Sequence, residues 1–393
     1  MSSPRVVLAG GGTGGHVFPM IAVADALRQL RPDVELLFVG TRRGLETRLV
    51  PERGYPLRLV DILPMRGGGP VGALRGATRA VTATLAERKY LAELEPCVVF
   101  SIGGYAAGPV ALAAYSLGIP VALLEPNSVI GLANRLMVPF VKRAYTAFPA
   151  TDRYFASKVR LRTGVPLRAQ FRAEPYALGA VPRILVLGGS QGAKSLNEAL
   201  PEAFCRLPAA LEVVHQCGAL HLQAVQALYS AKQREALKVE VVPFIDDMPS
   251  ALAQADLVIS RSGASAVSEI CAVGRPSLLL PYPYAAGDHQ RMNARALVEE
   301  GAAISVDADE VTPQRLAEEL GTLLEDRVRL STMAQAALRL ARPDAAEVIA
   351  KDLLALGGVV AGGSHEPETR RSRTGSVGTG PGYWGKLRQP EAF

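Results

Sequence analysis

Short apolar runs alternate with longer amphipathic stretches along most of the chain. This pattern is typical of parallel strands joined by helices. In the first half, the runs that predict strands are 5–9, 35–39, 57–62, 98–102 and 121–124. Helices are predicted at 19–30, 71–94 and 110–117. Because the runs are apolar throughout, each strand is expected to be buried on both faces, as in a doubly wound α/β sheet.

The alternation starts afresh after a linker that ends near Pro182. Strands are predicted at 183–187, 212–216, 239–242, 257–259, 277–280 and 302–306, and helices at 195–207, 266–273, 313–325, 328–340 and 344–356. The last helix is expected to cross back to the first half. The segment from Gly357 onward has few apolar residues, so it is expected to be disordered. The chain is therefore divided into Rossmann-like domains at 1–165 and 166–342, a helix at 343–356 and a tail at 357–393.

The stretch from Asp256 to Asn293 carries the richest candidate chemistry. Its strand stops at Ser262-Gly263, and Ser265 can cap a helix that begins near Ala266. Free backbone N–H groups at that helix start would suit a diphosphate at the carboxyl edge of the sheet. Glu269, one turn into the helix, would suit sugar hydroxyls, and Gln290 in a later loop offers an amide. The alternative is an ordinary strand–helix–strand unit with a solvated glutamate.

Glycine-rich loops follow the first strand of each half, at 10–16 and 188–193. Such loops let backbone N–H groups approach a phosphate closely. The strand at 35–39 ends without an acidic residue for an adenosine ribose, which argues against a dehydrogenase. Ile245 follows another strand and suits a flat base. Asn127 either forms a tight loop or orients a bound sugar.

Composition narrows the partners. The chain has 393 residues, 49% hydrophobic and 20% charged, which is ample for two cores. Its net charge of +6 favours anionic partners. Nucleic acid is discounted, because no Lys/Arg run is interleaved with aromatic residues. The four cysteines lack metal spacing and are expected to be reduced core residues of a cytosolic protein.

Two segments bear on membranes. The charge-free run at 97–124 mimics a membrane span, but its glycines and prolines favour a buried strand–helix–strand unit instead. The helix predicted at 71–94 carries Arg75, Arg79, Arg88 and Lys89 beside apolar residues. It is either a membrane-surface helix or an ordinary solvated one.

Five motifs together resemble glycosyltransferase family 28. They are GGTGGH at 11–16, GGYAAGP at 103–109, GGSQGAKSLN at 188–197, FIDDM at 244–248 and RSGASAVSE at 261–269. The resemblance covers residues 6 to about 356. It implies a GT-B glycosyltransferase with an acceptor domain, a UDP-GlcNAc domain and a cleft between them. It also implies transfer of N-acetylglucosamine from UDP-GlcNAc to a polyprenyl-diphosphate-linked muramoyl-pentapeptide, by a peripheral protein docked on an anionic membrane surface at the cytoplasmic face of the bacterial inner membrane.

The resemblance also assigns residues. Thr13, Gly14 and Gly15 match the loop that faces the donor diphosphate and the acceptor; Asn127 and Gln290 match sugar contacts. Arg168 matches a donor-site arginine, Ser190 a phosphate contact and Ile245 the uracil position. The start of the family's donor-site helix is matched by Ala264, Ser265, Ala266, Val267 and Ser268. Glu269 matches the ribose-binding carboxylate. Pro126 and Val165 depart from the family pattern, and the role of His289 is less defined than that of Gln290.

The expected catalytic residues are His16 and Glu269. An imidazole can take and release a proton near neutral pH, so His16 is expected to be the base, unless it only caps the next helix or hydrogen-bonds the acceptor. Helix N-termini after Gly189 and Ser265, with Arg168, could stabilise the departing UDP without a metal or cofactor. Arg261 stands where retaining relatives carry a glutamate, which favours inversion.

Two rival functions stay open. One is a GT-B UDP-sugar transferase that acts on a diacylglycerol or a small molecule. The other is a non-catalytic nucleotide-sugar sensor.

Overall fold

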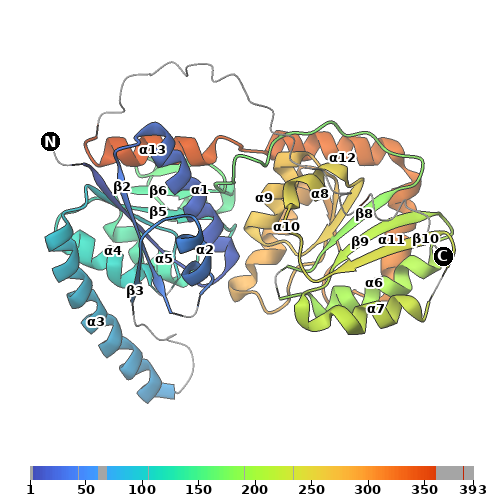
Figure 1. The fold of residues 1–393 in the computed structure, drawn as a ribbon, viewed down its shortest axis with the longest axis horizontal. Coiled ribbons are helices and arrows are strands. Elements are labelled where there is room, and N and C mark those ends of the chain that lie inside the picture. Colours follow the sequence, from blue (N-terminus) through green and yellow to red (C-terminus); the bar gives the residue numbers. More distant parts are fainter. Residues whose placement is uncertain are drawn as a thin grey trace. The chain divides into compact units, whose positions relative to one another are not determined.

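The computed structural model describes residues 3–42, 44–60, 69–104, 106–189, 191–232, 234–359 and 384, without the side chains of 69–77. The chain forms two compact units, residues 1–169 with 342–364 and residues 170–341 with 365–393 (Figure 1). The tail expected at 357–393 lies outside the described residues apart from 357–359 and 384.

The first unit is built on a parallel sheet of seven strands in the order β3-β2-β1-β4-β5-β6-β7. These strands are β1 (Arg5–Ala9), β2 (Glu35–Thr41), β3 (Leu57–Val60), β4 (Val98–Ser101), β5 (Val121–Glu125), β6 (Arg143–Thr146) and β7 (Arg160–Arg162). β1 lies between β2 and β4, with Val6 paired to Leu36 and Val98. The strand order therefore reverses between β1 and β4, which is where doubly wound folds bind ligands.

Helices cover both faces of this sheet. They are α1 (Gly14–Leu30), α2 (Glu46–Glu52), α3 (Gly69–Leu94), α4 (Ala107–Ser116), α5 (Leu132–Met137) and α13 (Ala345–Leu356), with 3₁₀ turns at Val138–Phe140 and Pro149–Tyr154. Val6 and Leu8 pack with α1 and α13, whereas Val7 and Ala9 pack with α3 and α4. This division follows from the two-residue period of a strand, and it explains why β1 is apolar at successive positions.

The second unit repeats the plan with six parallel strands in the order β10-β9-β8-β11-β12-β13. These are β8 (Arg183–Leu187), β9 (Leu211–Gln216), β10 (Leu237–Val242), β11 (Leu257–Ser260), β12 (Ser277–Leu279) and β13 (Ala303–Ser305). Its helices are α6 (Lys194–Arg206), α7 (Leu222–Ser230), α8 (Met248–Gln254), α9 (Ala264–Val273), α10 (His289–Glu299), α11 (Pro313–Glu325) and α12 (Arg327–Leu340), with 3₁₀ turns at Ala219–His221 and Ala286–Asp288. Its order reverses between β8 and β11. The prediction of two doubly wound α/β sheets is confirmed.

Three predicted helix starts and one predicted loop were wrong. α4 begins at Ala107 instead of residue 110. α1 begins at Gly14 instead of residue 19, because Thr13 is extended and serves as N-cap while Pro19 is accommodated inside the helix. α9 begins at Ala264, with extended Gly263 in place of Ser265 as N-cap. Gln290 lies in the first turn of α10 and not in a loop. The short strands β6 and β7 and the helices α2, α5, α7 and α8 were not predicted, because their apolar patterns are too short to separate from loops. The helix α10 was not predicted either.

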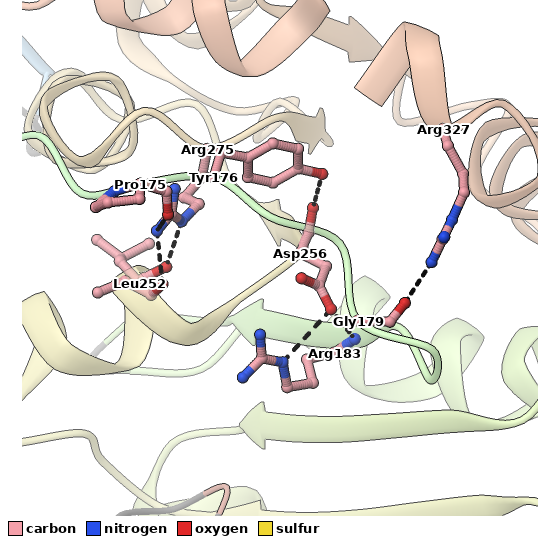
Figure 2. Close-up of polar contacts among 9 residues, drawn as sticks. Pro175, Tyr176, Gly179, Arg183, Leu252, Asp256, Arg275 and Arg327 are labelled. Carbon is pink, nitrogen blue, oxygen red and sulfur yellow. Dashed lines mark hydrogen bonds and ion pairs between the residues drawn. The ribbon is translucent and has the colours of Figure 1, made fainter. Parts of the chain in front are cut away.

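One buried arginine fastens the segment that leads into β8. The side chain of Arg275 is 1% exposed and lies just after α9. Its guanidinium donates to the carbonyl oxygens of Leu252 (3.0 Å) and Ala253 (2.6 Å) at the end of α8. It also donates to those of Glu174 (3.2 Å) and Pro175 (3.1 Å) in the entering segment. Figure 2 shows Arg275 with Pro175 and Leu252. Burial lowers the pKa of Arg275, and the ring of Tyr176 lies 5.5 Å from its guanidinium carbon.

Further contacts continue this fastening along the same segment. The Tyr176 hydroxyl donates to the Asp256 carbonyl (2.8 Å), and the Asp256 carboxylate accepts from the backbone N–H of Arg183 (2.8 Å). Arg327 donates to the carbonyl of Gly179 (Figure 2). Residues 174–183 are thus fixed to the second unit before its first strand begins.

Replacing Arg275 with methionine should lower the free energy of unfolding by about 2–4 kcal/mol. The reason is that several buried carbonyl groups lose their donor and methionine supplies none. Urea unfolding followed by circular dichroism would measure the change. The matched control is Arg295→Met on the exposed face of α10, where an i,i+4 pair with Glu299 is expected to be worth less than about 0.5 kcal/mol. Equal losses for the two variants would contradict the fastening role.

Candidate active site

In the first unit, two glycine-rich loops meet at the carboxyl edge between β1 and β4. Gly104 follows β4 in a left-handed conformation (φ 85°), and a Cβ there would lie 3.2 Å from the carbonyl oxygen of Gly11 and 3.9 Å from Nδ1 of His16. A side chain at 104 would therefore crowd the loop that follows β1. The motifs GGTGGH and GGYAAGP form one site in space, although they lie some 90 residues apart.

A buried carboxylate supports the first of these loops. Glu46 begins α2, is 0% exposed, and accepts from the backbone N–H of Gly12 (2.8 Å) and of Thr41 (2.8 Å). Cβ atoms at Gly11, Gly40 or Gly44 would each lie 2.5 Å or less from an atom of Glu46, so glycine is required around it. Sequence reasoning missed Glu46. The glycines on both sides of it were the available signal.

His16 lies in the first turn of α1, immediately beside this loop. Its Nδ1 is 3.1 Å from the carbonyl oxygen of Gly11. Because a carbonyl only accepts, this bond requires a proton on Nδ1, which leaves the Nε2 lone pair of a neutral ring available. Thr13 and Gly15 are exposed and Gly14 is partly exposed, so the helix start is open on the side that the sequence assigned to substrate.

Asn127 belongs to a loop that is organised by a second buried carboxylate. Glu125, 1% exposed at the end of β5, accepts from the backbone N–H of Asn127 (3.1 Å) and of Gly131 (2.9 Å) and from Nδ2 of Asn134 (3.0 Å). The Asn127 amide also approaches Glu125, at 3.4 Å. Both of the alternatives given for Asn127 are compatible with this loop, which holds its backbone in place.

Arg168 lies at the end of the first unit, with its guanidinium carbon 5.2 Å from the centre of the Phe18 ring. Phe18 follows His16 by two positions on α1. The sequence had placed Arg168 in the second domain; here it belongs to the unit that carries His16.

In the second unit, the loop after β8 and the start of α9 lie on either side of the reversal point. Ser190 is outside the described residues, so its predicted phosphate contact has no structural description. Asn197 on α6 donates to the carbonyl of Cys217 (3.0 Å), and its Oδ1 lies 3.1 Å from Nε2 of His215 on β9. Burial lowers the pKa of His215 to about 3, so it stays neutral there. These contacts fix the end of β9 against α6.

The start of α9 presents backbone donors. Val267 N–H bonds to the Gly263 carbonyl (3.0 Å), so the N–H groups of Ala264, Ser265 and Ala266 precede the first helical bond and point out of the helix end. The side chains of Ala264 and Val267 are buried, whereas Ser268 and Glu269 are partly exposed. An anion is expected to meet the backbone here, and Glu269 lies one turn further on.

Ile245 is 2% exposed, whereas its neighbour Phe244 is 45% exposed. The side chain of Ile245 is therefore part of the interior. Only its backbone groups are placed to meet a base at the end of β10.

Arg261 joins the loops after β11 and β12 to the start of α6. Its guanidinium donates to the carbonyls of Leu280 and Pro281 (both 3.0 Å) and to Oγ of Ser195 on α6 (2.8 Å). Gln290 is held in the same way, because its Oε1 accepts from the backbone N–H of Tyr282 (2.9 Å). Its NH₂ group is therefore the part that can donate to a ligand.

Two absences concern only the part of the chain that the structure describes. Within it, no group of three or more His, Cys, Asp or Glu residues has the arrangement of a metal site. Among the same residues, none of the helices combines the length and the apolar character needed to cross a lipid bilayer.

The predicted site residues divide between the two units. The first unit contains His16, Thr13, Gly14, Gly15, Asn127 and Arg168. The second unit contains Ile245, the α9 residues with Glu269, and Gln290. Most follow the carboxyl end of a strand of their own sheet, as expected for ligand-binding positions in such folds.

Comparison with known proteins gives matches over both units. The glycosyltransferase family 28 N-terminal domain matches residues 6–146, and the glycosyltransferase family 28 C-terminal domain matches residues 183–349. A protein of Sorangium cellulosum named UDP-N-acetylglucosamine–N-acetylmuramyl-(pentapeptide) pyrophosphoryl-undecaprenol N-acetylglucosamine transferase is 53% identical, with 89% of this chain and 88% of that protein covered. The protein of the same name from Nitrosococcus oceani is 42% identical, with 89% and 98% covered.

Solved structures also match this chain over most of its length. The crystal structure of Acinetobacter baumannii MurG matches with a TM-score of 0.76 and 35% identity, covering 90% of this chain and 99% of that one. A UDP-GlcNAc 2-epimerase of Neisseria meningitidis matches with a TM-score of 0.64 at 16% identity, covering 89% and 100%. The second likeness concerns the fold alone.

Proposed function

The chain belongs to glycosyltransferase family 28, and from this membership we propose that it transfers N-acetylglucosamine from UDP-GlcNAc to undecaprenyl-diphospho-N-acetylmuramoyl-pentapeptide. The product is the lipid-linked disaccharide precursor of peptidoglycan. The observation that carries this conclusion is 53% identity over 89% of the chain to a relative named for that reaction. The fold is the GT-B fold of that family.

The rival acceptors are less well supported. Nucleotide-sugar epimerases and transferases that act on small molecules share the fold at 19% identity or less, which says nothing about substrate. Eight relatives at 38–53% identity carry the name of the muramyl-pentapeptide reaction. A diacylglycerol acceptor has no such support.

His16 is the general base of the proposed mechanism. The bond from its Nδ1–H to the Gly11 carbonyl supports a neutral ring whose Nε2 removes the proton from the acceptor hydroxyl. Attack by that oxygen on the anomeric carbon, opposite the departing UDP, breaks the sugar–phosphate bond and inverts the configuration. Arg261 stands where retaining relatives carry a glutamate, and its guanidinium, a cation without a lone pair to donate, cannot act as a nucleophile, in accord with inversion.

The second unit holds the donor in this proposal. Glu269 accepts from the ribose hydroxyls, and the backbone of Ile245 meets the uracil. The N–H groups at the start of α9, at residues 264–266, meet the diphosphate, together with the loop around Ser190. These donors and Arg168 supply the stabilisation of departing UDP that a metal provides in other transferases. Gln290 donates its amide to a sugar hydroxyl.

A direct test offers the purified protein radiolabelled UDP-GlcNAc with each acceptor in turn. The expected result is label transfer to the polyprenyl-linked muramoyl-pentapeptide and none to diacylglycerol. Transfer of the label to diacylglycerol alone would show that the acceptor is diacylglycerol and not the muramoyl-pentapeptide. Tight UDP-GlcNAc binding without turnover on any acceptor would favour a nucleotide-sugar sensor.

We further propose that the protein docks peripherally on the cytoplasmic face of the inner membrane, because the acceptor's polyprenyl chain stays in the bilayer. The surface that supports this, here called the α3–α5 face, lies in the first unit, where α3 packs on α4 and α4 on α5. Its exposed apolar side chains are Val81, Leu85, Leu112, Tyr115, Leu132 and Leu136. Arg79, Arg88 and Lys89 are exposed on α3; the side chain of Arg75 lies outside the described residues. Apolar groups bordered by cations suit an anionic lipid surface.

Reversing charge at Arg79 and Arg88 together should weaken binding to anionic vesicles by at least about 30-fold at low salt, since the loss of each basic residue costs about 1 kcal/mol and the introduced carboxylates are repelled by the surface. Co-sedimentation with phosphatidylglycerol vesicles, repeated at rising salt, measures this. Arg295→Glu on α10 of the second unit is the control. If the affinity for the vesicles changed neither with salt nor with these substitutions, the α3–α5 face would not be the docking surface.

A further inference from the structure

A pair of tyrosines lies at the carboxyl end of β12, in the loop that leads to α10. Tyr282 is 44% exposed and Tyr284 is 82% exposed. Their ring centres are 5.6 Å apart with an angle of 74° between the planes, an edge-to-face contact. Neither residue belongs to the motifs that assign the site. The loop nevertheless occupies the edge where the donor residues of the second unit gather.

The pair is held rigidly. The guanidinium carbon of Arg261 lies 5.5 Å from the centre of the Tyr282 ring, and the backbone N–H of Tyr282 donates to Oε1 of Gln290. The turn closes with a bond from Ala285 N–H to the Tyr282 carbonyl (3.2 Å). Asp288 at its end adopts a left-handed conformation (φ 58°), which is uncommon outside glycine and is found in tightly determined loops. Fixing an aromatic ring in advance reduces the entropy that is lost when a ligand binds to it.

Chemistry indicates the ligand. A pyranose ring has one face of C–H groups that stacks on an aromatic ring and a rim of hydroxyls that needs hydrogen-bond donors. The loop offers both, because the backbone N–H of Tyr282 donates to Oε1 of Gln290, whose NH₂ is the amide's remaining polar group. Apolar rings with a few convergent polar groups are the usual composition of a small-molecule site.

We infer that Tyr282 and Tyr284 form an aromatic platform for the apolar face of the donor's N-acetylglucosamine ring, with Tyr284 as the contacting residue. Tyr282 is a positioning residue, because Arg261 and Gln290 hold it and it holds Tyr284. This inference rests on the proposed function, since it names where that donor's sugar sits. It adds a specificity determinant that acts on the sugar and not on the nucleotide.

Calorimetric titration of UDP-GlcNAc and of UDP separates the two parts of the donor. Tyr284→Ala should weaken UDP-GlcNAc about 3- to 10-fold, the usual worth of one aromatic contact, and leave UDP within about 2-fold. Tyr284→Phe keeps the ring and should bind UDP-GlcNAc as the wild type does. Val328→Ala, at an exposed apolar residue of α12, should alter neither affinity. Because Tyr284 is so exposed, these variants should all fold.

The contrary outcomes are distinct. Equal losses for UDP and UDP-GlcNAc, or no loss for either, would overturn the platform while the transferase function stands. A Tyr284→Ala effect confined to the KM for the lipid acceptor would also overturn the assignment to the donor sugar. Failure of the wild type to bind UDP-GlcNAc at all would overturn the proposed function itself.

Discussion

Replacing His16 with alanine should lower kcat about 10²- to 10⁴-fold, the usual cost of losing a general base. Because the base acts only when unprotonated, wild-type kcat/KM should fall at low pH, and His16→Ala should flatten that limb of the profile. The affinity for UDP-GlcNAc should be nearly unchanged, since the proposed donor contacts are mainly residues of the second unit. Steady-state kinetics over a range of pH, with calorimetry for the donor, measures all three.

A second variant separates base catalysis from positioning. Glutamine at position 16 can still donate a hydrogen bond toward the Gly11 carbonyl, but it cannot take up a proton. It should therefore be nearly as slow as alanine. His365→Ala, which removes a histidine with no proposed role, is the control. A His16→Gln enzyme that retains the acid limb with only a small loss of rate would require another base.

Glu269→Ala should weaken UDP-GlcNAc binding by about 1.5–3 kcal/mol, because a charge-assisted hydrogen bond to the ribose hydroxyls is lost. That corresponds to about 10- to 150-fold in Kd. The contact can be isolated with 2′,3′-dideoxy-UDP, which lacks those hydroxyls. The wild type should bind UDP more tightly than the dideoxy compound, and the mutant should bind the two equally.

The control is Glu299→Ala, which removes an exposed carboxylate of α10 that pairs with Arg295. It should leave both affinities within error. A wild-type protein that fails to distinguish UDP from its dideoxy analogue would show that Glu269 does not read the ribose, whatever the mutant does.

The candidate site was predicted in part. The glycines of the first loop predicted close backbone approach, because glycine has no side chain to obstruct it. Glu46 was missed because its role depends on glycines at 11, 40 and 44 that only the folded sheet brings around it. The tyrosine platform was missed for a related reason, since a loop tyrosine carries no periodic signal until its neighbours are known.

Helix starts were the weakest part of the sequence reasoning. Pro19 suggested a first turn, but the extended Thr13 began α1 five residues earlier, and Gly263 took the cap that Ser265 was expected to supply. Start residues depend on which backbone leaves a strand extended, and this is decided by the loop's tertiary contacts.

The sequence by itself determined the two α/β units, the buried strands and the family, because apolar periodicity and spaced glycine motifs are local properties of the chain. Only the tertiary structure decided which strands are neighbours, so that the loops after β1 and β4 meet, and those after β8 and β11. It likewise determined the tautomer of His16 that bonds to Gly11, the fastening by Arg275 and the partners of Arg261. These depend on hydrogen bonds between residues far apart in the chain, whose geometry exists only once the sheet has formed.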